Sequence, residues 1–386
     1  MRLFYATTAP ADFINAHRAW ESGEHFDREV SLTFSGQVED FLAKTNAQAL
    51  LVSGHSDGEQ FKGGSLEIRH LPRRPATGWR WHLEDRRHAR RLVELAKEFR
   101  ADVAVVDSGT MPFGQLAALQ EAGIEVIPVF HNTLYPPNGP SLLQRLEAPL
   151  ARRVLRRTTP IHVSPACKRQ VGHGLEIRAQ FSRDYFKQVG PASFETPFNV
   201  FFVGRVDAIK GIFDIVEAAK ICGDEVTWTI CGGGPDLGRL REASRGLPID
   251  VRGWTSLEEL VELRTRCQAV IVPTTTNFEE GMAMTAVEAI LSGRPLITNW
   301  VVPALEVLRP ACIEAQPDDP VSYAEAALSL ARNRERWQGL VGACAGLAEP
   351  FYDRRYGLTE ALAEILCPEI SDYAEPPGDP TAVASR

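Results

Sequence analysis

The sequence predicts an α/β protein built from two doubly wound domains in tandem, facing each other across a cleft. Along both halves of the chain, short apolar runs alternate with helix-like stretches. This alternation is typical of parallel sheets that carry helices on both faces. The chain has 386 residues, which is too long for one ordinary domain and sufficient for two.

The apolar runs give the expected elements in order. In the first half we expect strands at residues 2–7, 48–53, 66–70, 102–107, 125–131 and 161–164, with helices at 86–99 and 113–121. In the second half we expect strands at residues 199–203, 226–231, 249–251, 269–273, 295–298 and 312–315, with helices at 212–221 and 257–267.

Composition sets the domain bounds. A linker rich in Gly, Pro and Ser at residues 188–196 places the first domain at 1–190 and the second at 191–350. Residues 351–366 are expected to form a helix that packs back toward the first domain. The Pro-, Asp- and Ser-rich residues 367–386 are expected to be disordered.

Charge and cysteine content exclude several classes of protein. No run is long enough to span a bilayer, and the first residues are expected to form a strand rather than a targeting segment. Seven cysteines without a C-x-x-C pair indicate reduced thiols and a cytoplasmic location. The net charge of −8 is uneven, with 25 basic against 21 acidic residues up to residue 190 and 17 against 29 after it. No basic stripe with interleaved aromatics appears, so a nucleic-acid partner is not expected.

The stretch FEEGMAMTAVEAILSG at residues 278–293 carries the strongest chemical signal. It follows a buried strand, and we expect a helix that starts near Gly281, with Glu280 just ahead of it and Glu288 two turns along. The backbone N–H groups of Gly281, Met282 and Ala283 would favour an anion at the helix start. A diphosphate flanked by polyols, as in a nucleotide sugar, would fit. The alternative interpretation is an ordinary amphipathic helix with solvated acids.

A second stretch, FNVFFVGRVDAIKG at residues 198–211, supports the first. Its strand ends at Gly204 and Arg205, and Lys210 opens the next helix, so a guanidinium and an ammonium lie where a diphosphate could bind. Two solvated cations on a loop are the alternative. The glycines of CGGGPDLG at 231–238 do not have the spacing of a dinucleotide fingerprint, and we interpret them as a tight turn.

Together, the motifs at residues 203–211, 231–235, 251–260 and 269–298 resemble the retaining glycosyltransferases of family 4, which have the GT-B fold. The resemblance implies that Arg205 and Lys210, beside Gly204, hold the donor diphosphate. It implies that Glu280 is catalytic and binds sugar hydroxyls, and that Glu288 binds the ribose. It further assigns sugar and phosphate contacts to the backbone of Gly281, Met282, Ala283 and Met284, and the nucleotide base to Gly253 and Trp254.

The first half resembles the family less closely. His131, after the strand at 125–131, matches the histidine that many members place beside the transferred sugar, and it is the second catalytic candidate. A strand-end histidine satisfied by its neighbours is the alternative. Polar residues at the same strand ends are acceptor-side candidates: Asp107, Ser108 and Asn132.

Three features depart from the family pattern. The usual Gly-Gly loop is replaced by ATTAPADF at residues 6–13, Ala283 stands where many members have Gly, and residues 177–189 hold no Asn-Gly-Val-Asp-like segment.

The expected activity is transfer of a sugar from a UDP- or GDP-sugar to a glycan, a lipid-linked sugar or a small molecule, in glycan, polysaccharide or glycolipid biosynthesis. The resemblance implies front-face attack, in which the leaving phosphate deprotonates the acceptor hydroxyl. No Asp-x-Asp motif or zinc-like spacing appears, so neither a metal nor another cofactor is expected. One alternative is a catalytically degenerate GT-B protein that binds nucleotide sugars or acts as a scaffold. A nicotinamide-dependent oxidoreductase would need a fingerprint that the chain lacks.

Residues 142–157 form one more unusual pattern. Leucines at helical spacing are interrupted by Pro149 and surrounded by five arginines. A basic amphipathic helix of this kind binds anionic lipid, which would place the protein peripherally at the inner face of a membrane. The other interpretation is a core-facing helix with solvated arginines.

Overall fold

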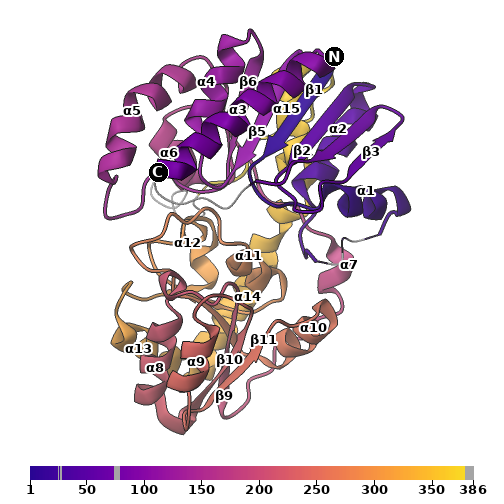
Figure 1. Ribbon diagram of the computed structural model, residues 1–386. Helices are drawn as coiled ribbons and strands as arrows, with labels where there is room; N and C mark the ends of the chain where they lie inside the picture. The colour runs from indigo at the N-terminus through magenta and orange to yellow at the C-terminus, as the bar shows by residue number, and fades with distance from the viewer. Residues whose placement is uncertain (25, 27, 74–78, 379–386) are drawn as a thin grey trace, which may run out of the picture. The chain divides into compact units, whose positions relative to one another are not determined.

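The computed structural model describes residues 1–24, 26, 28–73 and 79–378, with the backbone alone for residues 79–83. The chain folds into two compact units (Figure 1). The first unit contains Met1–Tyr135, Pro140–Gln180 and Asp353–Pro376, and the second contains Pro136–Gly139 and Phe181–Tyr352. The chain therefore passes between the units at several points, and the one nearest to the linker that we inferred from composition is at residues 180–181.

The first unit contains an eight-stranded sheet in the order β3-β4-β2-β1-β5-β6-β7-β8. All its neighbouring strands are parallel except β3, which pairs antiparallel with β4. Its strands are β1 (Arg2–Thr7), β2 (Gln48–Ser53), β3 (Gln60–Gly63), β4 (Leu66–His70), β5 (Val103–Ser108), β6 (Glu125–Phe130), β7 (Ile161–His162) and β8 (Leu175–Glu176). Its helices are α1 (Phe13–Ser22), α2 (Phe34–Thr45), α3 (Trp79–Phe99), α4 (Phe113–Glu121), α5 (Leu142–Leu155), α6 (Pro165–Val171) and α15 (Leu358–Leu366).

The second unit contains a six-stranded parallel sheet in the order β11-β10-β9-β12-β13-β14. Its strands are β9 (Phe198–Val203), β10 (Val226–Cys231), β11 (Ile249–Gly253), β12 (Ala269–Val272), β13 (Leu296–Thr298) and β14 (Cys312–Glu314). Its α-helices are α7 (Arg183–Phe186), α8 (Ile212–Cys222), α9 (Leu237–Ala243), α10 (Leu257–Arg266), α11 (Met284–Leu291), α12 (Ala304–Leu308), α13 (Pro320–Ala331) and α14 (Arg334–Ala348). The core beneath this sheet includes Trp228, Phe198 and Tyr323, all of them buried.

All the expected strands are present, but one helix boundary differs in a way that matters. The helix expected near Gly281 starts at Met284. Ala283 precedes it with a left-handed backbone, at φ 59° and ψ 86°, and such a residue cannot continue a right-handed helix. Gly281 and Met282 therefore lie in the loop before the helix, and the expected helix start was wrong by one turn.

Smaller differences occur elsewhere. The β6 strand ends at Phe130, so His131 lies just beyond it. The helix expected at 86–99 begins earlier, at Trp79. The helix expected at 142–157 ends at Leu155 and runs through Pro149.

The C-terminal segment packs on the first unit. The backbone N–H of Leu358, at the start of α15, donates to the side chain of Gln37 in α2 over 2.8 Å, and Lys44 pairs with Glu360 at 2.7 Å. In Figure 1 the yellow α15 lies among the indigo and violet elements of this unit. Residues 367–378 were expected to be disordered, but the hydroxyl of Tyr373 donates to the carbonyl of Glu176 over 2.9 Å. The rest of that expected tail, residues 379–386, lies outside the described residues.

In the part of the chain that the structure describes, no helix is both long enough and apolar enough to cross a bilayer.

Candidate functional site

The loop after β9 is held against the end of β12. Gly211 has φ 73°, and a Cβ at this position would lie 2.0 Å from the carbonyl oxygen of Pro273. Only glycine fits this position, both sterically and by its backbone angle. The motif Lys210-Gly211 thus brings the lysine to the carboxyl edge of the sheet.

Lys210 and Glu280 form a shielded ion pair at this edge. The Nζ atom of Lys210 lies 2.6 Å from Oε2 of Glu280, and the hydroxyl of Thr274 donates to the same oxygen over 2.9 Å. The Lys210 ammonium also lies 4.0 Å from the centre of the Phe278 ring, at cation–π distance. The side chain of Lys210 is 22% exposed and that of Glu280 is 8% exposed. Two residues that are 70 positions apart in sequence therefore make direct contact, as their strand-end positions predicted.

Arg205 points elsewhere. Its guanidinium is 61% exposed and lies 2.6 Å from the carboxylate of Asp207. Among the described residues, Asp207 is the ion-pair partner of Arg205, so the structure does not join Arg205 to the Lys210–Glu280 pair.

The start of α11 docks beside the same loop. The hydroxyl of Thr285 donates to the carbonyl of Val203 over 2.9 Å, next to Gly204. The positive end of the helix dipole therefore lies at Met284, beside the end of β9. The helix N-terminus expected at Gly281 is thus present three residues later, and Glu280 reaches the site from the loop.

Glu288 lies in the second turn of α11 and is buried. Its carboxylate accepts a short hydrogen bond from the guanidinium of Arg264, in α10, which is 2% exposed. Arg264 also donates to the hydroxyl of Tyr185 over 2.8 Å. Burial raises the pKa of the Glu288 carboxyl, and the Arg264 guanidinium opposes this shift. Sequence reasoning missed Arg264 and Tyr185, because neither lies in a recognisable motif.

The glycine-rich turn after β10 supports this edge. A Cβ at Gly232 would lie 1.8 Å from the carbonyl oxygen of Gly204, so the two loops touch through their backbones. The N–H of Gly232 donates to the carbonyl of Gly253 over 2.6 Å, and Gly253 itself has φ 83°. These contacts agree with the interpretation of CGGGP as a tight turn. Trp254 follows with 80% of its surface exposed, so its indole is accessible to a ligand.

In the first unit, His131 lies at the end of a chain of polar contacts. Its Nε2 atom lies 2.6 Å from Oδ1 of Asp107, and the hydroxyl of Tyr5 donates a short hydrogen bond to Oδ2 of the same carboxylate. The rings of His131 and Phe34 pack at 88° to each other with a centroid distance of 4.5 Å. The ends of β1, β5 and β6 thus bring together three polar side chains, of which sequence reasoning missed Tyr5.

These contacts change how the first-unit groups titrate. Burial alone would lower the pKa of His131, but the Asp107 carboxylate, helped by the Glu29 carboxylate, outweighs burial, and the pKa of His131 is raised above its ordinary value. Burial and the neighbouring Asp107 raise the pKa of Tyr5 well above its ordinary value. Tyr5 therefore stays a neutral donor, and His131 holds its proton more strongly than a free histidine.

A cavity of about 200 Å³ opens onto this chain and is lined by Tyr5, Asp107, His131, Phe34 and Glu29, with residues of the loop that replaces the expected Gly-Gly segment. That loop is held in place, because Ser53 donates to the carbonyl of Ala11 over 2.6 Å.

The other two acceptor-side candidates differ from Asp107. Ser108 is buried and its hydroxyl donates to the carbonyl of Thr110 over 2.7 Å, so it stabilises its own turn. Asn132 lies against Gly109, with its amide nitrogen 3.3 Å from the position of a Cβ there.

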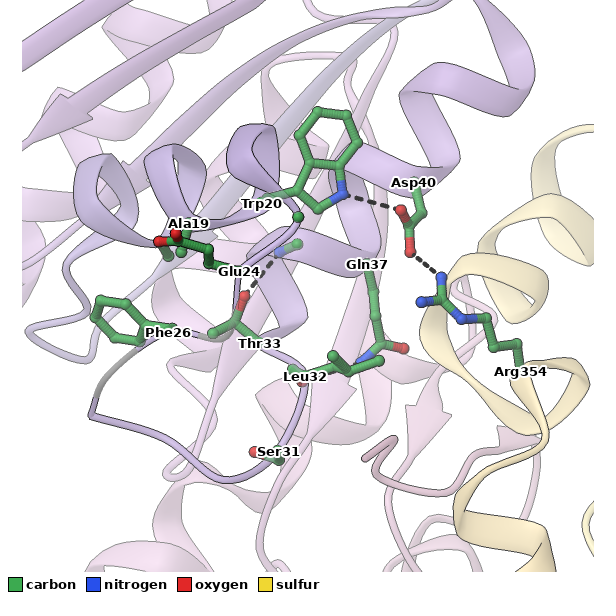
Figure 2. Close-up of a pocket in the computed structure, with 13 residues that line it drawn as sticks. Ala19, Trp20, Glu24, Phe26, Ser31, Leu32, Thr33, Gln37, Asp40 and Arg354 are labelled. Atoms are coloured by element: carbon green, nitrogen blue, oxygen red, sulfur yellow. Dashed lines mark hydrogen bonds and ion pairs between the residues drawn. The ribbon is translucent and has the colours of Figure 1, made fainter. Parts of the chain in front are cut away.

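A second cavity of about 230 Å³ adjoins the first, since Ala16, Phe26 and Thr33 line both. Figure 2 shows the indole N–H of Trp20 donating to Asp40, which also accepts from Arg354. Together the two cavities form a polar and aromatic hollow in the first unit.

Comparison with known proteins identifies both units. Residues 40–171 match the glycosyl transferase 4-like domain, and residues 197–333 match the group 1 glycosyl transferases. No curated protein matches the chain.

Several solved structures are similar over nearly the whole chain. Anabaena HepE in complex with UDP is 16% identical with a TM-score of 0.66, covering 95% of this chain and 99% of its own. Sucrose-phosphate synthase from Thermosynechococcus elongatus is 13% identical with a TM-score of 0.70, covering 95% and 98%. An E. coli structure described as trehalose-6-phosphate bound with UDP-2-fluoro glucose is 12% identical with a TM-score of 0.69, covering 98% and 100%. These likenesses confirm the predicted α/β GT-B fold.

Proposed function

Because this chain belongs to the group 1 glycosyltransferases, we propose that it transfers a sugar from a nucleotide-sugar donor to an acceptor and retains the anomeric configuration. The observation that carries the proposal is the Lys210–Glu280 pair beside the start of α11. A cation, an acid and a helix N-terminus at the carboxyl edge of a parallel sheet fit a diphosphate joined to a polyol.

We propose a UDP-sugar as the donor, since similar structures hold UDP and UDP-2-fluoro glucose. Lys210 and the N-terminus of α11 would hold the diphosphate, and the exposed Arg205 would exchange its partner Asp207 for a phosphate oxygen. The loop backbone at 281–284 would lie near the sugar. The carboxylate oxygen of Glu288 that does not bind Arg264 would accept a hydrogen bond from a ribose hydroxyl. The nucleotide base would stack on the exposed Trp254.

The chemistry follows from the groups present. The bond between the anomeric carbon and the diphosphate breaks, and a bond to the acceptor oxygen forms on the same face. The acceptor proton passes to a leaving phosphate oxygen, so the charges balance. Lys210 and the helix N-terminus stabilise the departing diphosphate, while Glu280 and His131 orient the sugar.

The deciding experiment is calorimetric titration with UDP, followed by a turnover assay with a panel of UDP-sugars. Binding with turnover supports the enzyme. Binding without turnover on any donor and acceptor would favour the degenerate, nucleotide-sugar-binding alternative. No binding of UDP, GDP or ADP would contradict the donor site itself.

Catalysis is proposed to need no divalent metal, because Lys210 and Arg205 supply the positive charge that a metal would otherwise bring to the diphosphate. Turnover should therefore survive excess chelator. Loss of turnover on chelation that magnesium or manganese restores would overturn this proposal.

The acceptor is proposed to enter the two adjoining cavities of the first unit, with its reacting hydroxyl near His131 and its remainder near Trp20. A glycan, a lipid-linked sugar and a small molecule all remain candidates. A labelled UDP-sugar incubated with lipid extracts, polysaccharides or simple sugars would show which fraction takes up the label.

We also propose that α5 contacts an anionic membrane surface. Ala151, Val154 and Leu155 face the protein core, whereas Leu142 and Leu146 are 77% and 70% exposed on the opposite side. Five arginines are exposed on or beside this outer side: Arg145, Arg152, Arg153, Arg156 and Arg157. The exposed leucines would insert among lipid acyl chains, and the arginines around them would contact anionic headgroups.

Sedimentation with vesicles tests this contact. The protein should bind vesicles that contain phosphatidylglycerol and bind vesicles of phosphatidylcholine much less. Leu142→Ser with Leu146→Ser should reduce binding, while Ile221→Ser, at a 50% exposed apolar position of the second unit, should not. Equal binding by both variants would exclude α5 as the contact.

A further inference from the structure

Three side chains that can bind a metal ion meet at the first-unit sheet, and none of them lines the cavity at His131. His55 follows the end of β2, and His70 is the last residue of β4. These two strands are parallel neighbours, with Ser53 opposite His70. Asp57 lies in the turn between β2 and β3. Topology therefore brings all three side chains to the carboxyl ends of adjacent strands.

The two imidazoles converge on one carboxylate. The Nδ1 atom of His55 lies 3.0 Å from Oδ2 of Asp57, and the Nδ1 atom of His70 lies 2.7 Å from Oδ1. One ligating atom from each of the three residues lies within 4.8 Å of the other two. In a tetrahedral zinc site with bonds of about 2.0–2.2 Å, ligand atoms lie roughly 3.3 Å apart. Side-chain adjustments of under an ångström or so would therefore give that spacing.

Both histidines are incompletely satisfied by the protein. His70 is 2% exposed, and among the described residues its Nε2 atom has no hydrogen-bond partner. The Nδ1 atom of His55 is also buried and has no hydrogen bond of good geometry in the described chain, although the Asp57 carboxylate is close. A buried polar atom without a partner is unfavourable by about 1–3 kcal/mol. An ion bound between the Nδ1 atoms and the Asp57 carboxylate would give the Nδ1 atom of His55 a partner.

We propose that His55, Asp57 and His70 bind one divalent first-row transition metal ion, of which Zn²⁺ fits best. Two imidazoles and one carboxylate form a ligand set that Zn²⁺ accepts, whereas Mg²⁺ and Ca²⁺ prefer oxygen ligands alone. Asp57 has 32% of its side chain exposed, so a water molecule can complete the coordination.

This ion stabilises the fold and takes no part in sugar transfer. Its three ligands tie the turn at residues 54–59 to β4, and none of them belongs to the donor site or to the His131 cavity. Metal binding at this site is therefore compatible with sugar transfer that needs no metal.

The experiment is a titration of the metal-stripped full-length protein with Co²⁺, followed by visible absorption. We expect one Co²⁺ per chain, with the d–d bands of a low-coordinate site that Zn²⁺ displaces and Mg²⁺ does not. Zn²⁺ should also raise the melting temperature. His55→Asn, which alters a partly exposed ligand, should weaken Co²⁺ binding by roughly a hundredfold or more, since even indirect contacts to a metal change affinity by about 10–100-fold.

His173→Gln is the matched control, because His173 is an exposed histidine outside the cluster. Its Co²⁺ spectrum should equal that of the wild type. If the wild type did not bind Co²⁺ in a one-to-one complex, the three side chains would only hydrogen-bond to one another, and the proposal would be overturned. Unchanged binding by His55→Asn and by Asp57→Asn would overturn it too. Neither outcome depends on glycosyl transfer, so the proposed function is judged separately.

Discussion

The acids at the candidate sites of the two units have different kinds of partner. In the second unit, Glu280 is paired with Lys210 and Glu288 with Arg264, so each carboxylate meets a cation that keeps its charge at neutral pH. In the first unit, Asp107 contacts His131, whose charge depends on pH, and Tyr5, which stays neutral. The comparison indicates that pH dependence should arise at His131 in the first unit, whose pKa is raised, and at Glu288 in the second unit, where burial raises the pKa of the carboxyl.

The two pairs of the second unit also differ from each other. Lys210 and Glu280 lie on loops, and Lys210 is partly exposed, so a ligand can exchange with the pair. Arg264 and Glu288 lie on helices and are almost fully enclosed. A change at the first pair should therefore affect ligand binding and turnover, and a change at the second should affect folding as well.

The largest effect is expected from Glu288→Gln, despite its near-isosteric shape. The substitution leaves the buried guanidinium of Arg264 without its counter-ion, which typically destabilises a protein by roughly 3–5 kcal/mol. Urea unfolding would measure the loss. Glu225→Gln breaks the exposed pair with Arg332 and should lower stability by about 1 kcal/mol at most. Equal stability of the two variants would mean that the buried pair is not structural.

At temperatures where the Glu288→Gln variant is folded, it should also bind the nucleotide-sugar donor and the free nucleoside diphosphate more weakly. Both affinities should fall alike, because the ribose contact is present in both complexes. Unchanged nucleotide affinity would remove Glu288 from the ribose site.

Next in size is Glu280→Gln, which should lower kcat by about a hundredfold while UDP binding stays near wild type. A misaligned anomeric carbon slows chemistry on this scale. The side-chain oxygen of the glutamine can still accept a hydrogen bond from Thr274, so circular dichroism should show an unchanged fold. Glu217→Gln, on the surface of α8, is the control. Normal turnover in Glu280→Gln would exclude the sugar-end assignment.

A smaller effect is expected from Lys210→Ala. Loss of one charge-assisted contact to the diphosphate weakens the binding free energy by roughly 1.5–3 kcal/mol, so UDP affinity should fall about tenfold or more. Calorimetry gives the affinity, and Lys220→Ala, which alters a surface pair with Glu217, provides the comparison. If UDP bound both variants equally, Lys210 would have no place in the donor site.

The smallest expected effect is a change in the pH dependence of folding stability in the Asp107→Asn variant. The pKa of His131 is raised in the folded protein, so the folded state binds the proton more tightly than the unfolded state. The resulting stability is fully present below the ordinary histidine pKa of about 6.5 and is lost as pH rises through the raised value. Asp107→Asn removes the carboxylate that raises the pKa of His131 more strongly, and the charge of Glu29 stays.

Urea unfolding of wild type and Asp107→Asn across this pH range checks the sign. The wild-type free energy of unfolding should fall with rising pH more steeply than that of the variant. Parallel pH curves would show that Asp107 does not control the protonation of His131.

The sequence by itself determined the fold class, because alternation of apolar runs and helical stretches is a local property that any parallel α/β sheet requires. It also placed Lys210 and Glu280 at one sheet edge, since both follow strands whose carboxyl ends lie together.

Only the tertiary structure decided the partners. Arg264 reaches Glu288 from another helix and also donates to Tyr185, and Tyr5 reaches Asp107 from another strand, so no spacing in the sequence records these contacts. Ala283 illustrates the same limit at the backbone: the positive φ that delays α11 by one turn depends on the loop packed around it, and alanine gives no local sign of it. Long-range packing is set by the whole fold, whereas a sequence pattern reports only neighbours along the chain.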